Sequence, residues 1–493
     1  MNGTGAPTAA APSTPTWLRA FPLLFGLVLG VCLVKFGNPV VLDTRIEAPV
    51  SAGEWWTQAW PVRWAFPLLL AVSVAGLAFG RPATRLRESG LPVGFVLLPF
   101  LWIGWQFLAA DSTEDRLLSS TTLRQLAGVA TCFAVGWIAL APGMRRSLLW
   151  VGLLLGLLFC LNRAAQQRLF EFRQDHDALV EGQATGWTNY APALLDQMRR
   201  DGLLVSTNGL EVVNPAILDK MRRARVNGTL VYPNALAGVV LLLLPAALAV
   251  LAAATVGMKA SVRRLLLGVV LLLGAAVLFW TGSKAGWLVA IAVGTLWLAL
   301  QPIPARLRLM LAGVVLVGGL GVFGLRFAGY FAQGATSATA RADYWKAALR
   351  NTREHPLLGS GPGTFQRPYQ RLKAPESEMT RLVHNDFLEQ ATDSGVPGFL
   401  LYVGWVGWGL WILGVRHARV AGGSSGTIPV ETAVFYGLLA WFLHGTAEFG
   451  LYIPASAWTA FTLFGALAGE GRGTAAGAGA GVGSRADAVA PAA

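Results

Sequence analysis

Residues 229–254, TLVYPNALAGVVLLLLPAALAVLAAA, form an apolar run without a single charged side chain. A helix of about 20 apolar residues is long enough to cross the hydrocarbon core of a bilayer. The run is apolar on every side, as expected of a helix surrounded by lipid or by other membrane helices. We therefore predict a membrane span, with Pro233 in its first turn, where its missing N–H has no helical partner to lose.

Similar runs recur along the chain and predict an all-α polytopic membrane protein of about twelve transmembrane helices. The expected spans are residues 18–37, 64–80, 91–109, 122–142, 146–162, 229–254, 264–281, 285–301, 308–328, 396–416, 428–446 and 453–469. Two long polar loops, 163–228 and 329–395, separate the blocks of helices 18–162, 229–328 and 396–470. Tails 1–17 and 471–493 have no core-forming pattern and are predicted to be disordered.

The composition favours the same class. Of the 493 residues, 54% are hydrophobic and 13% are charged, whereas roughly 25% are charged in a typical soluble domain. We attribute the net charge of +13 to basic cytoplasmic loops and not to nucleic-acid binding. Cys32, Cys132 and Cys160 all lie in apolar runs and are predicted to be buried thiols.

Basic residues in the short loops predict the orientation. If the N-terminus is cytoplasmic, the short cytoplasmic loops contain Arg81, Arg85, Arg87, Arg145, Arg146, Lys259, Arg263, Arg264, Arg306, Arg308, Arg416 and Arg419. The short loops on the other side contain few basic residues, so both termini are expected in the cytoplasm. Both long loops then lie outside, and within the second we predict helices at 338–354 and 376–394, the latter closed by Gly395 and Pro397.

Four clusters of unusual residues fall on this outer side. They are RVNGTLVYPNALAG (225–238), TGSKAG (281–286), the loop segments RADYW (341–345), PLLGSGPGTF (356–365) and HNDFLE (384–389), and HGTAEFGLYIPASAW (444–458). Each has an ordinary explanation, such as an interfacial Arg225, a turn at Lys284 or a surface His384 on a helix. Their convergence on one face is the main indication of function.

Cationic groups at the outer leaflet suit a lipid-linked diphosphate, because they would neutralise charge on the leaving group. The glycine run at 359–363 could present backbone N–H groups to a phosphate. Glu448, between two spans, needs a cationic partner, for which Arg341, Arg225 and Lys284 are candidates. Asn234, at the edge of a span, could bond a freed backbone group.

His384 can accept a proton from a hydroxyl group near neutral pH. Asn385 and Glu389 are four residues apart and could order that site from one helical face. The sequence has no Asp-x-Asp pair and no cluster of His and Cys, so it does not indicate a metal-dependent sugar transferase.

In their order and sidedness, these clusters resemble the bacterial O-antigen ligase and polymerase superfamily. The first, residues 225–234, is similar to an Arg, Gly-Thr, Pro-Asn element before a membrane helix, and Ser283-Lys284 is similar to a Ser-Arg element. Residues 449–457 are similar to a late motif at the outer edge. The large loop contributes Arg341, Trp345, Pro356, Gly359, Gly361, Phe365, His384, Asn385, Leu388, Gly395 and Gly398.

The resemblance implies glycosyl transfer from an undecaprenyl diphosphate-linked glycan, at the periplasmic face of the bacterial inner membrane and without metal or cofactor. It implies a fold similar to GT-C-type lipid-sugar transferases. It assigns diphosphate binding to Arg225 and Arg341, joined here by Lys284, which lacks the bidentate fork of the family's usual Arg. His384 is the expected acceptor-activating residue, with Asn385 and Glu389 beside it.

Asn234, Ser283, Trp345 and Glu448 are expected to support this site. The acceptor stays open between lipid A-core, a growing glycan and a protein, because Asn385 follows His384 where ligases often have Ser.

Two other classes of function remain in competition. About twelve spans also fit a transporter or a flippase of lipid-linked glycans, although such proteins usually carry ionisable residues at mid-membrane and repeated halves. A scaffold role would leave the polar clusters without chemistry.

Overall fold

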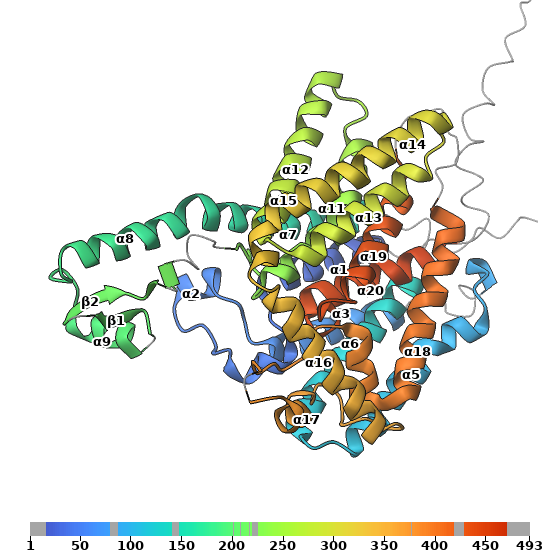
Figure 1. The fold of residues 1–493 in the computed structure, drawn as a ribbon. Coiled ribbons are helices and arrows are strands. Elements are labelled where there is room, and N and C mark those ends of the chain that lie inside the picture. The colour runs from blue at the N-terminus through green and yellow to red at the C-terminus, as the bar shows by residue number, and fades with distance from the viewer. Residues whose placement is uncertain are drawn as a thin grey trace, which may run out of the picture.

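Apolar helices form a bundle from which a polar arm projects (Figure 1). The computed structural model describes residues 16–78, 87–140, 147–200, 202–207, 209–215, 217–218, 225–375, 377–418 and 428–470. Almost all of both predicted tails lies outside these residues, as do Arg81, Arg85, Arg145, Arg146 and Arg419 of the predicted cytoplasmic loops.

A helix lies at every position where a span was expected. These helices are α1 (Thr16–Lys35), α3 (Ala65–Ala78), α5 (Val93–Asp111), α6 (Arg116–Ala139), α7 (Ser147–Gln166), α11 (Pro233–Ala254), α12 (Ala260–Thr281), α13 (Lys284–Ala299), α14 (Ala305–Gly313) continued by α15 (Gly319–Ala332), α18 (Asp386–His417), α19 (Val430–His444) and α20 (Pro454–Ala468). A π-helical turn, η4 (Val314–Gly318), joins α14 to α15. The structure therefore supports the predicted class of a helical, multi-span membrane protein.

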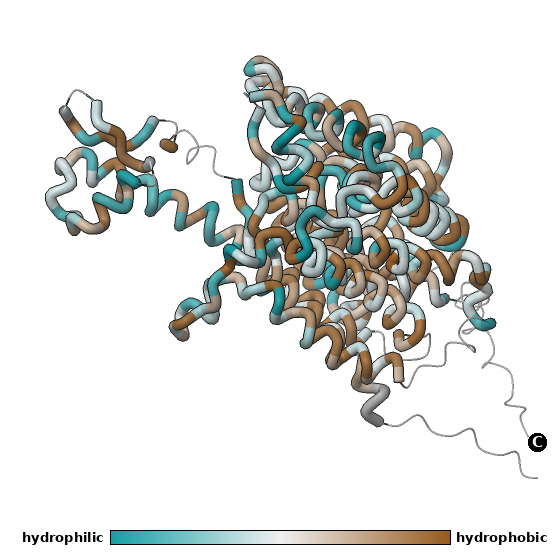
Figure 2. Tube along the Cα trace, turned by 90° about the horizontal axis from the view of Figure 1, so that it is seen from below, coloured by the Kyte–Doolittle hydropathy of each residue, from teal (hydrophilic) through white to brown (hydrophobic). Residues whose placement is uncertain are grey.

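The number of spans stays a prediction. Within the described residues, seven helices are long and apolar enough to cross a membrane, and shorter apolar helices lie at Ala20–Lys35, Val62–Ala78, Lys284–Ala299 and Val430–His444. In Figure 2, brown apolar stretches dominate the bundle, while teal hydrophilic stretches interrupt the arm.

Glycines let several of these helices pack with their backbones in contact. Gly26 of α1 faces Gly152 of α7, where a Cβ added to Gly152 would lie 2.1 Å from the carbonyl atoms of Gly26. In α6, a Cβ on Gly136 would lie 2.2 Å from the carbonyl oxygen of Thr462 in α20. Small residues at such crossings bring membrane helices close enough for extensive van der Waals contact.

The first long polar segment is an arm built on a helix that does not stop at the membrane. Helix α7 continues through a π-helical turn, η3 (Gln167–Glu171), into α8 (Phe172–Ala184), so that Ser147–Ala184 is one helix. The loop that was expected to begin at residue 163 is therefore helical at its start. The polar residues here end the apolar stretch but do not end the helix.

Beyond α8, the arm contains α9 (Pro192–Arg200) and an antiparallel hairpin of β1 (Leu204–Thr207) and β2 (Leu210–Val213). This hairpin departs from the all-α prediction. The arm has a small hydrophobic core of its own, which is formed by Trp187, Met198, Leu204 and Val213. In Figure 1 the arm lies to the left of the bundle.

The second long polar segment contains α16 (Thr336–Glu354), close to the predicted 338–354, and α17 (Gln366–Leu372). The helix predicted at 376–394 is wrong in its first half, because residues 377–385 are not helical and α18 begins at Asp386. His384 has a left-handed φ of 57°, which interrupts a helix, and Asn385 is the N-cap. The predicted break at Gly395 is present as a kink, with φ 70° at that residue.

Short elements complete the end of the bundle that carries Glu448, which we call the polar end. They are η1 (Val40–Arg45), α2 (Ala52–Thr57) and η2 (Val62–Trp64), all between α1 and α3, and η5 (Gly450–Tyr452) before α20. Arg381 Nη1 donates a hydrogen bond to the carbonyl oxygen of Val41 at 3.0 Å, which ties η1 to the loop before His384.

The α1–α7 crossing should be sensitive to one methyl group. We expect Gly152→Ala to lower the stability by about 1–3 kcal/mol, because the added Cβ meets backbone that cannot rotate away. Gly104→Ala in α5 is the matched control, since no atom lies within 4 Å of its Cβ. Thermal unfolding of both variants in detergent would show the difference, and equal midpoints would contradict the packing described here.

Candidate active site

A buried carboxylate, Glu448, connects three of the sequence clusters. It lies between α19 and η5, and 5% of its surface is exposed. Its Oε1 accepts a hydrogen bond from Asn234 Nδ2 at 2.6 Å and another from Arg341 Nη2. Its Oε2 lies 3.5 Å from His384 Nδ1, an ion-pair distance. The cationic partner predicted for Glu448 is therefore Arg341.

Arg225 is fixed beside this carboxylate by two other partners. Its Nε donates to the carbonyl oxygen of Thr281 at 2.6 Å, and its Nη2 donates to Asn234 Oδ1. The Asn234 side chain thus bridges Arg225 and Glu448, and does not bond a freed backbone group as expected.

The turn after Arg225 is held by Gln167 at the base of the arm. Gln167 Oε1 accepts the N–H groups of Asn227 at 3.2 Å and Gly228 at 2.9 Å. Gln167 Nε2 donates to the carbonyl oxygen of Gly228 at 3.3 Å. Gly228 has φ 62°, and a Cβ there would lie 2.9 Å from the carbonyl oxygen of Cys160, so the turn requires glycine.

Ser283 and Lys284 begin α13 next to Arg225. Ser283 is the N-cap, and its Oγ accepts the N–H of Gly286 at 3.2 Å. The ammonium of Lys284 lies 3.8 Å from the ring centroid of Tyr330, a cation–π contact. Lys284 is close enough to Arg225 and Arg341 for their charges to act on it.

His384 lies between two aromatic rings at the polar end. Its ring stacks on Tyr344 with centroids 5.9 Å apart and meets Phe449 edge-on at 4.7 Å. The side chain is 26% exposed, so it is accessible to a ligand. Because Nδ1 faces Glu448, Nε2 is the nitrogen placed to exchange a proton with a substrate.

The side-chain oxygens of Asn385 and Glu389 accept hydrogen bonds from the backbone around His384. Asn385 Oδ1 accepts the N–H groups of Phe387 at 3.0 Å and Leu388 at 3.1 Å. Glu389 is fully buried and accepts the N–H of Val383. Both contacts fix the backbone on either side of His384, which favours positioning roles.

Trp345 packs at the edge of a small core formed by Tyr344, Tyr369, Val383 and neighbours. This core supports Tyr344, the residue that stacks on His384. Trp345 thus lies behind the site, at one remove from His384.

The glycine run at 359–363 serves the packing of α18. The N–H groups of Ser360 and Gly361 bond the carbonyl oxygens of Thr392 and Asp393 at 2.9 and 3.0 Å, and Gly363 N–H bonds Asp393 Oδ2 at 2.8 Å. These donors are occupied within the protein, so the phosphate-binding role considered for the run is corrected.

The charges at the polar end stabilise one another. Burial alone would raise the pKa of Glu448, but the hydrogen bonding and charge of His384 and the charges of Arg341 and His444 outweigh it and lower this pKa. Burial is the main cause that lowers the pKa of Arg225, with Glu448 and Arg341 as its charged neighbours. The site therefore contains an ionised carboxylate among several cations.

Three further residues of this site lie within the quoted clusters, but the sequence predicted no role for them. His444 is buried, with Nε2 3.5 Å from Ser283 Oγ, and Tyr344 and Phe449 enclose His384. His444 lies one helical turn before Glu448, a spacing that could have indicated it. The contacts of Tyr344 and Phe449 with His384 join separate segments and leave no local signal.

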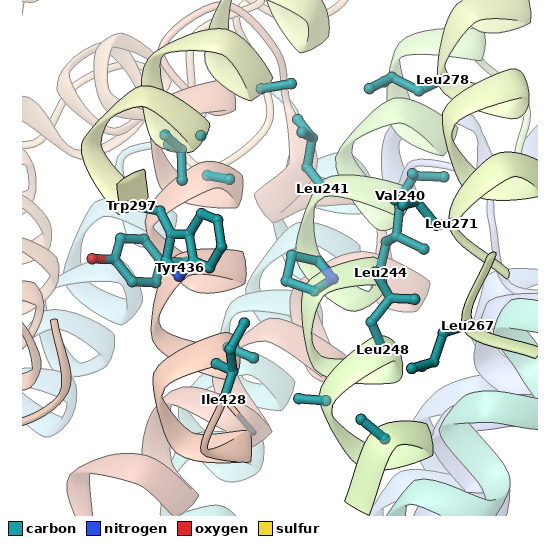
Figure 3. Close-up of a pocket in the computed structure, with 18 of the residues that line it drawn as sticks. Val240, Leu241, Leu244, Leu248, Leu267, Leu271, Leu278, Trp297, Ile428 and Tyr436 are labelled. Carbon is teal, nitrogen blue, oxygen red and sulfur yellow. The ribbon is translucent and has the colours of Figure 1, made fainter. Parts of the chain in front are cut away.

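An apolar cavity of about 670 Å³ lies between α11, α12, α13 and α19 (Figure 3). Aliphatic side chains of α11 and α12 line it, together with Trp297 of α13 and Tyr436 of α19. Each of these four helices carries a site residue at its polar end: Asn234 in the first turn of α11, Thr281 at the end of α12, Lys284 at the start of α13 and His444 at the end of α19. The lining of the cavity runs along α12 from Leu278, one turn from Thr281, to Arg263 near the other end of this helix.

Together, the fold and the site define a multi-span membrane protein with a cationic, histidine-containing centre at one end of its helix bundle. The sequence model of the O-antigen ligase family matches residues 267–403, a region that contains Ser283, Lys284, Arg341 and His384. Over this region the chain is similar to the O-antigen ligase family, which supports the resemblance to the O-antigen ligase and polymerase superfamily predicted from the sequence. A comparison with curated proteins finds no match.

The ionisation of Glu448 should be visible in the stability. Because its pKa lies below the ordinary value of 4.5 in the folded protein, the stabilisation is present above that value and is lost as the pH falls through the lower folded pKa. We expect Glu448→Gln to cost on the order of 3 kcal/mol at neutral pH, since Arg341 loses its buried partner. The gap to the parent should narrow below pH 4.5.

Thermal unfolding of both proteins from pH 7 to pH 3 measures this gap. Glu47→Gln, at an exposed position, is the control and should differ little from the parent at any pH. A gap that stays constant through the acid range would show that Glu448 is not ionised in the folded protein.

Proposed function

We propose that this protein transfers a glycan from an undecaprenyl diphosphate carrier to an acceptor hydroxyl at the periplasmic face of the bacterial inner membrane. The observation that carries the proposal is an apolar cavity between helices whose polar ends hold Arg225 and Lys284. A carrier with a polyprenyl chain and a diphosphate head needs such a cavity joined to such a charge. The match to the O-antigen ligase family supports the same class of reaction.

In the proposed step, Nε2 of His384 accepts the proton of the acceptor hydroxyl. The acceptor oxygen forms a bond to the anomeric carbon of the donor glycan, and the bond from that carbon to the diphosphate oxygen breaks. The lipid diphosphate leaves with the bonding electron pair, and its added charge is stabilised by Arg225, Arg341 and Lys284. Glu448, facing Nδ1, orients the imidazole and stabilises the imidazolium that forms.

Asn385 and Glu389 are positioning residues in this scheme, because their bonds fix the backbone that holds His384 in its left-handed conformation. Asn234 and Ser283 are also positioning residues. Asn234 positions Arg225 and Glu448, and Ser283 positions the start of α13. The acceptor is proposed only as a hydroxyl of a lipid A-core, glycan or protein.

Loss of the base or of a diphosphate-binding cation should greatly reduce transfer by the fraction of each variant that is shown to be folded. We expect His384→Ala to reduce the rate by about 10²-fold or more and Arg341→Ala by about 10²-fold. The assay follows release of undecaprenyl diphosphate from a carrier-linked oligosaccharide in EDTA, with a panel of acceptors.

Exposed residues of the same types provide the controls. His355→Ala and Arg350→Ala, at exposed positions in or next to α16, should keep the parental rate. Full activity of both His384→Ala and Arg341→Ala would rule out the roles proposed for these two residues. Movement of the carrier across liposomes without a covalent product would favour a flippase instead.

The cavity should select for the length of the lipid chain. Gly294 lines it, and a Cβ there meets only Val315 at 3.9 Å, so Gly294→Leu should fold while narrowing the space. We expect the KM for an undecaprenyl donor to rise about tenfold, through lost chain burial, while the KM for a geranyl donor changes little.

Gly313→Leu on α14 is the control, because nothing lies within 4 Å of its Cβ. An equal effect of Gly294→Leu on both donors would mean that the cavity does not hold the lipid chain.

A further inference from the structure

Two further arginines, Arg45 and Arg381, lie on other segments of the polar end. Arg45 is the last residue of η1, and Arg381 is three residues before His384. The bond from Arg381 to the carbonyl oxygen of Val41, 3.0 Å long, brings the two segments together. Neither arginine takes part in the contacts of Glu448 described above.

The carboxylate of Asp43, two residues before Arg45, is already occupied by another arginine. Asp43 accepts the N–H of Arg63 at 3.2 Å and pairs with its guanidinium at 3.4 Å. Among the residues that the structure describes, none forms an ion pair with Arg45 or Arg381. Burial first, and then the charge of Arg45, lowers the pKa of Arg381. Two guanidinium groups held close in this way gain from an anion supplied from outside.

Tyr232 links this pair to His384. It is the N-cap of α11, and 38% of its surface is exposed. Its ring meets that of Phe449 edge-on at 5.4 Å, and Phe449 in turn meets His384 at 4.7 Å. The charges of Arg381 and Arg45 both act on the phenol group of Tyr232. The arginine pair is therefore separated from His384 by Tyr232 and Phe449.

We infer that Arg45, Arg381 and Tyr232 form an acceptor subsite that binds an anionic group of the glycan acceptor, either a phosphate monoester or a carboxylate. Guanidinium groups bind both with paired hydrogen bonds, and the phenol can donate another. The inference rests on the proposed transfer reaction, because it places this anion beside the hydroxyl that His384 activates.

The two cationic groups have different surroundings, which argues against one shared role in donor binding. The charged neighbours of Arg225 are Glu448 and Arg341, whereas the charged neighbour of Arg381 is Arg45. Arg225 is also bonded to Thr281 at the end of α12, one of the helices that line the apolar cavity. A carrier lipid is thus expected at Arg225, and the water-soluble part of the acceptor at Arg45.

The test measures binding apart from catalysis, with the full-length protein in detergent. The probes are three forms of one methyl disaccharide, with a phosphate monoester, with a uronic carboxylate, and neutral. We expect the parent to bind one or both anionic forms about tenfold more tightly than the neutral form. Added salt should weaken this preference, and the preferred anion identifies the source of the charge.

Variants then assign the preference to residues. Arg45→Gln and Arg381→Gln should remove it, Arg45→Lys should keep part of it, and Arg116→Gln, at another exposed arginine, should leave it unchanged. If Arg381→Gln fails to fold because its bond to Val41 is lost, Arg45→Gln decides the question, since Arg45 makes no such bond. Undecaprenyl diphosphate binding should be the same in Arg45→Gln as in the parent.

Two results would overturn the inference. One is equal affinity of the parent for the charged and neutral disaccharides. The other is weaker binding of undecaprenyl diphosphate by Arg45→Gln, which would assign the pair to the donor. A parent protein that does not bind undecaprenyl diphosphate at all would instead remove the proposed function, and the disaccharide comparison would still stand as a separate result.

Discussion

The polar end depends on a negative charge buried among positive ones. One carboxylate oxygen of Glu448 accepts hydrogen bonds from Asn234 and Arg341, and the other oxygen faces His384. A carboxylate at this depth is unfavourable by itself, and so are three cations crowded together without it. Each charge therefore makes the burial of the others possible, and residues from four separate segments are held in one place. The same arrangement turns Nδ1 of His384 toward Glu448 and gathers positive charge at the polar end.

Membrane spans were predictable from the sequence, because a bilayer imposes length and apolarity on each of them. The partner of Glu448 was predictable for a related reason, since a charge at that depth must be neutralised and few cations were available. The start of α18 was not predictable. Residues 376–394 have a helical pattern, but the left-handed His384 and the cap at Asn385 delay the helix by ten residues. The N–H of Asp386 bonds the carbonyl oxygens of Gly445 and Glu448 and fixes that conformation, and the local sequence does not contain these tertiary contacts.

The sequence predicted several residues that meet at the site, and the structure corrected some of their predicted contacts. Arg225, Arg341, His384 and Glu448 meet, as their common sidedness indicated. The glycine run looked suitable for phosphate, yet its N–H groups are used by Thr392 and Asp393. A glycine-rich sequence indicates that the backbone closely approaches another group, but it does not identify that group. The aromatic contacts of His384 were invisible, because Tyr344 and Phe449 are about forty and sixty-five residues away along the chain.

The unbroken helix from Ser147 to Ala184 has a mechanical meaning. A helix is stiff over this length, so the arm and the membrane segment α7 tilt together as one lever. Gln167 is at its pivot, and the same side chain grips both the N–H and the carbonyl of Gly228, three residues after Arg225. The orientation of the arm is therefore coupled to the backbone that carries Arg225. The arm and Arg225 therefore share one point of attachment, the side chain of Gln167.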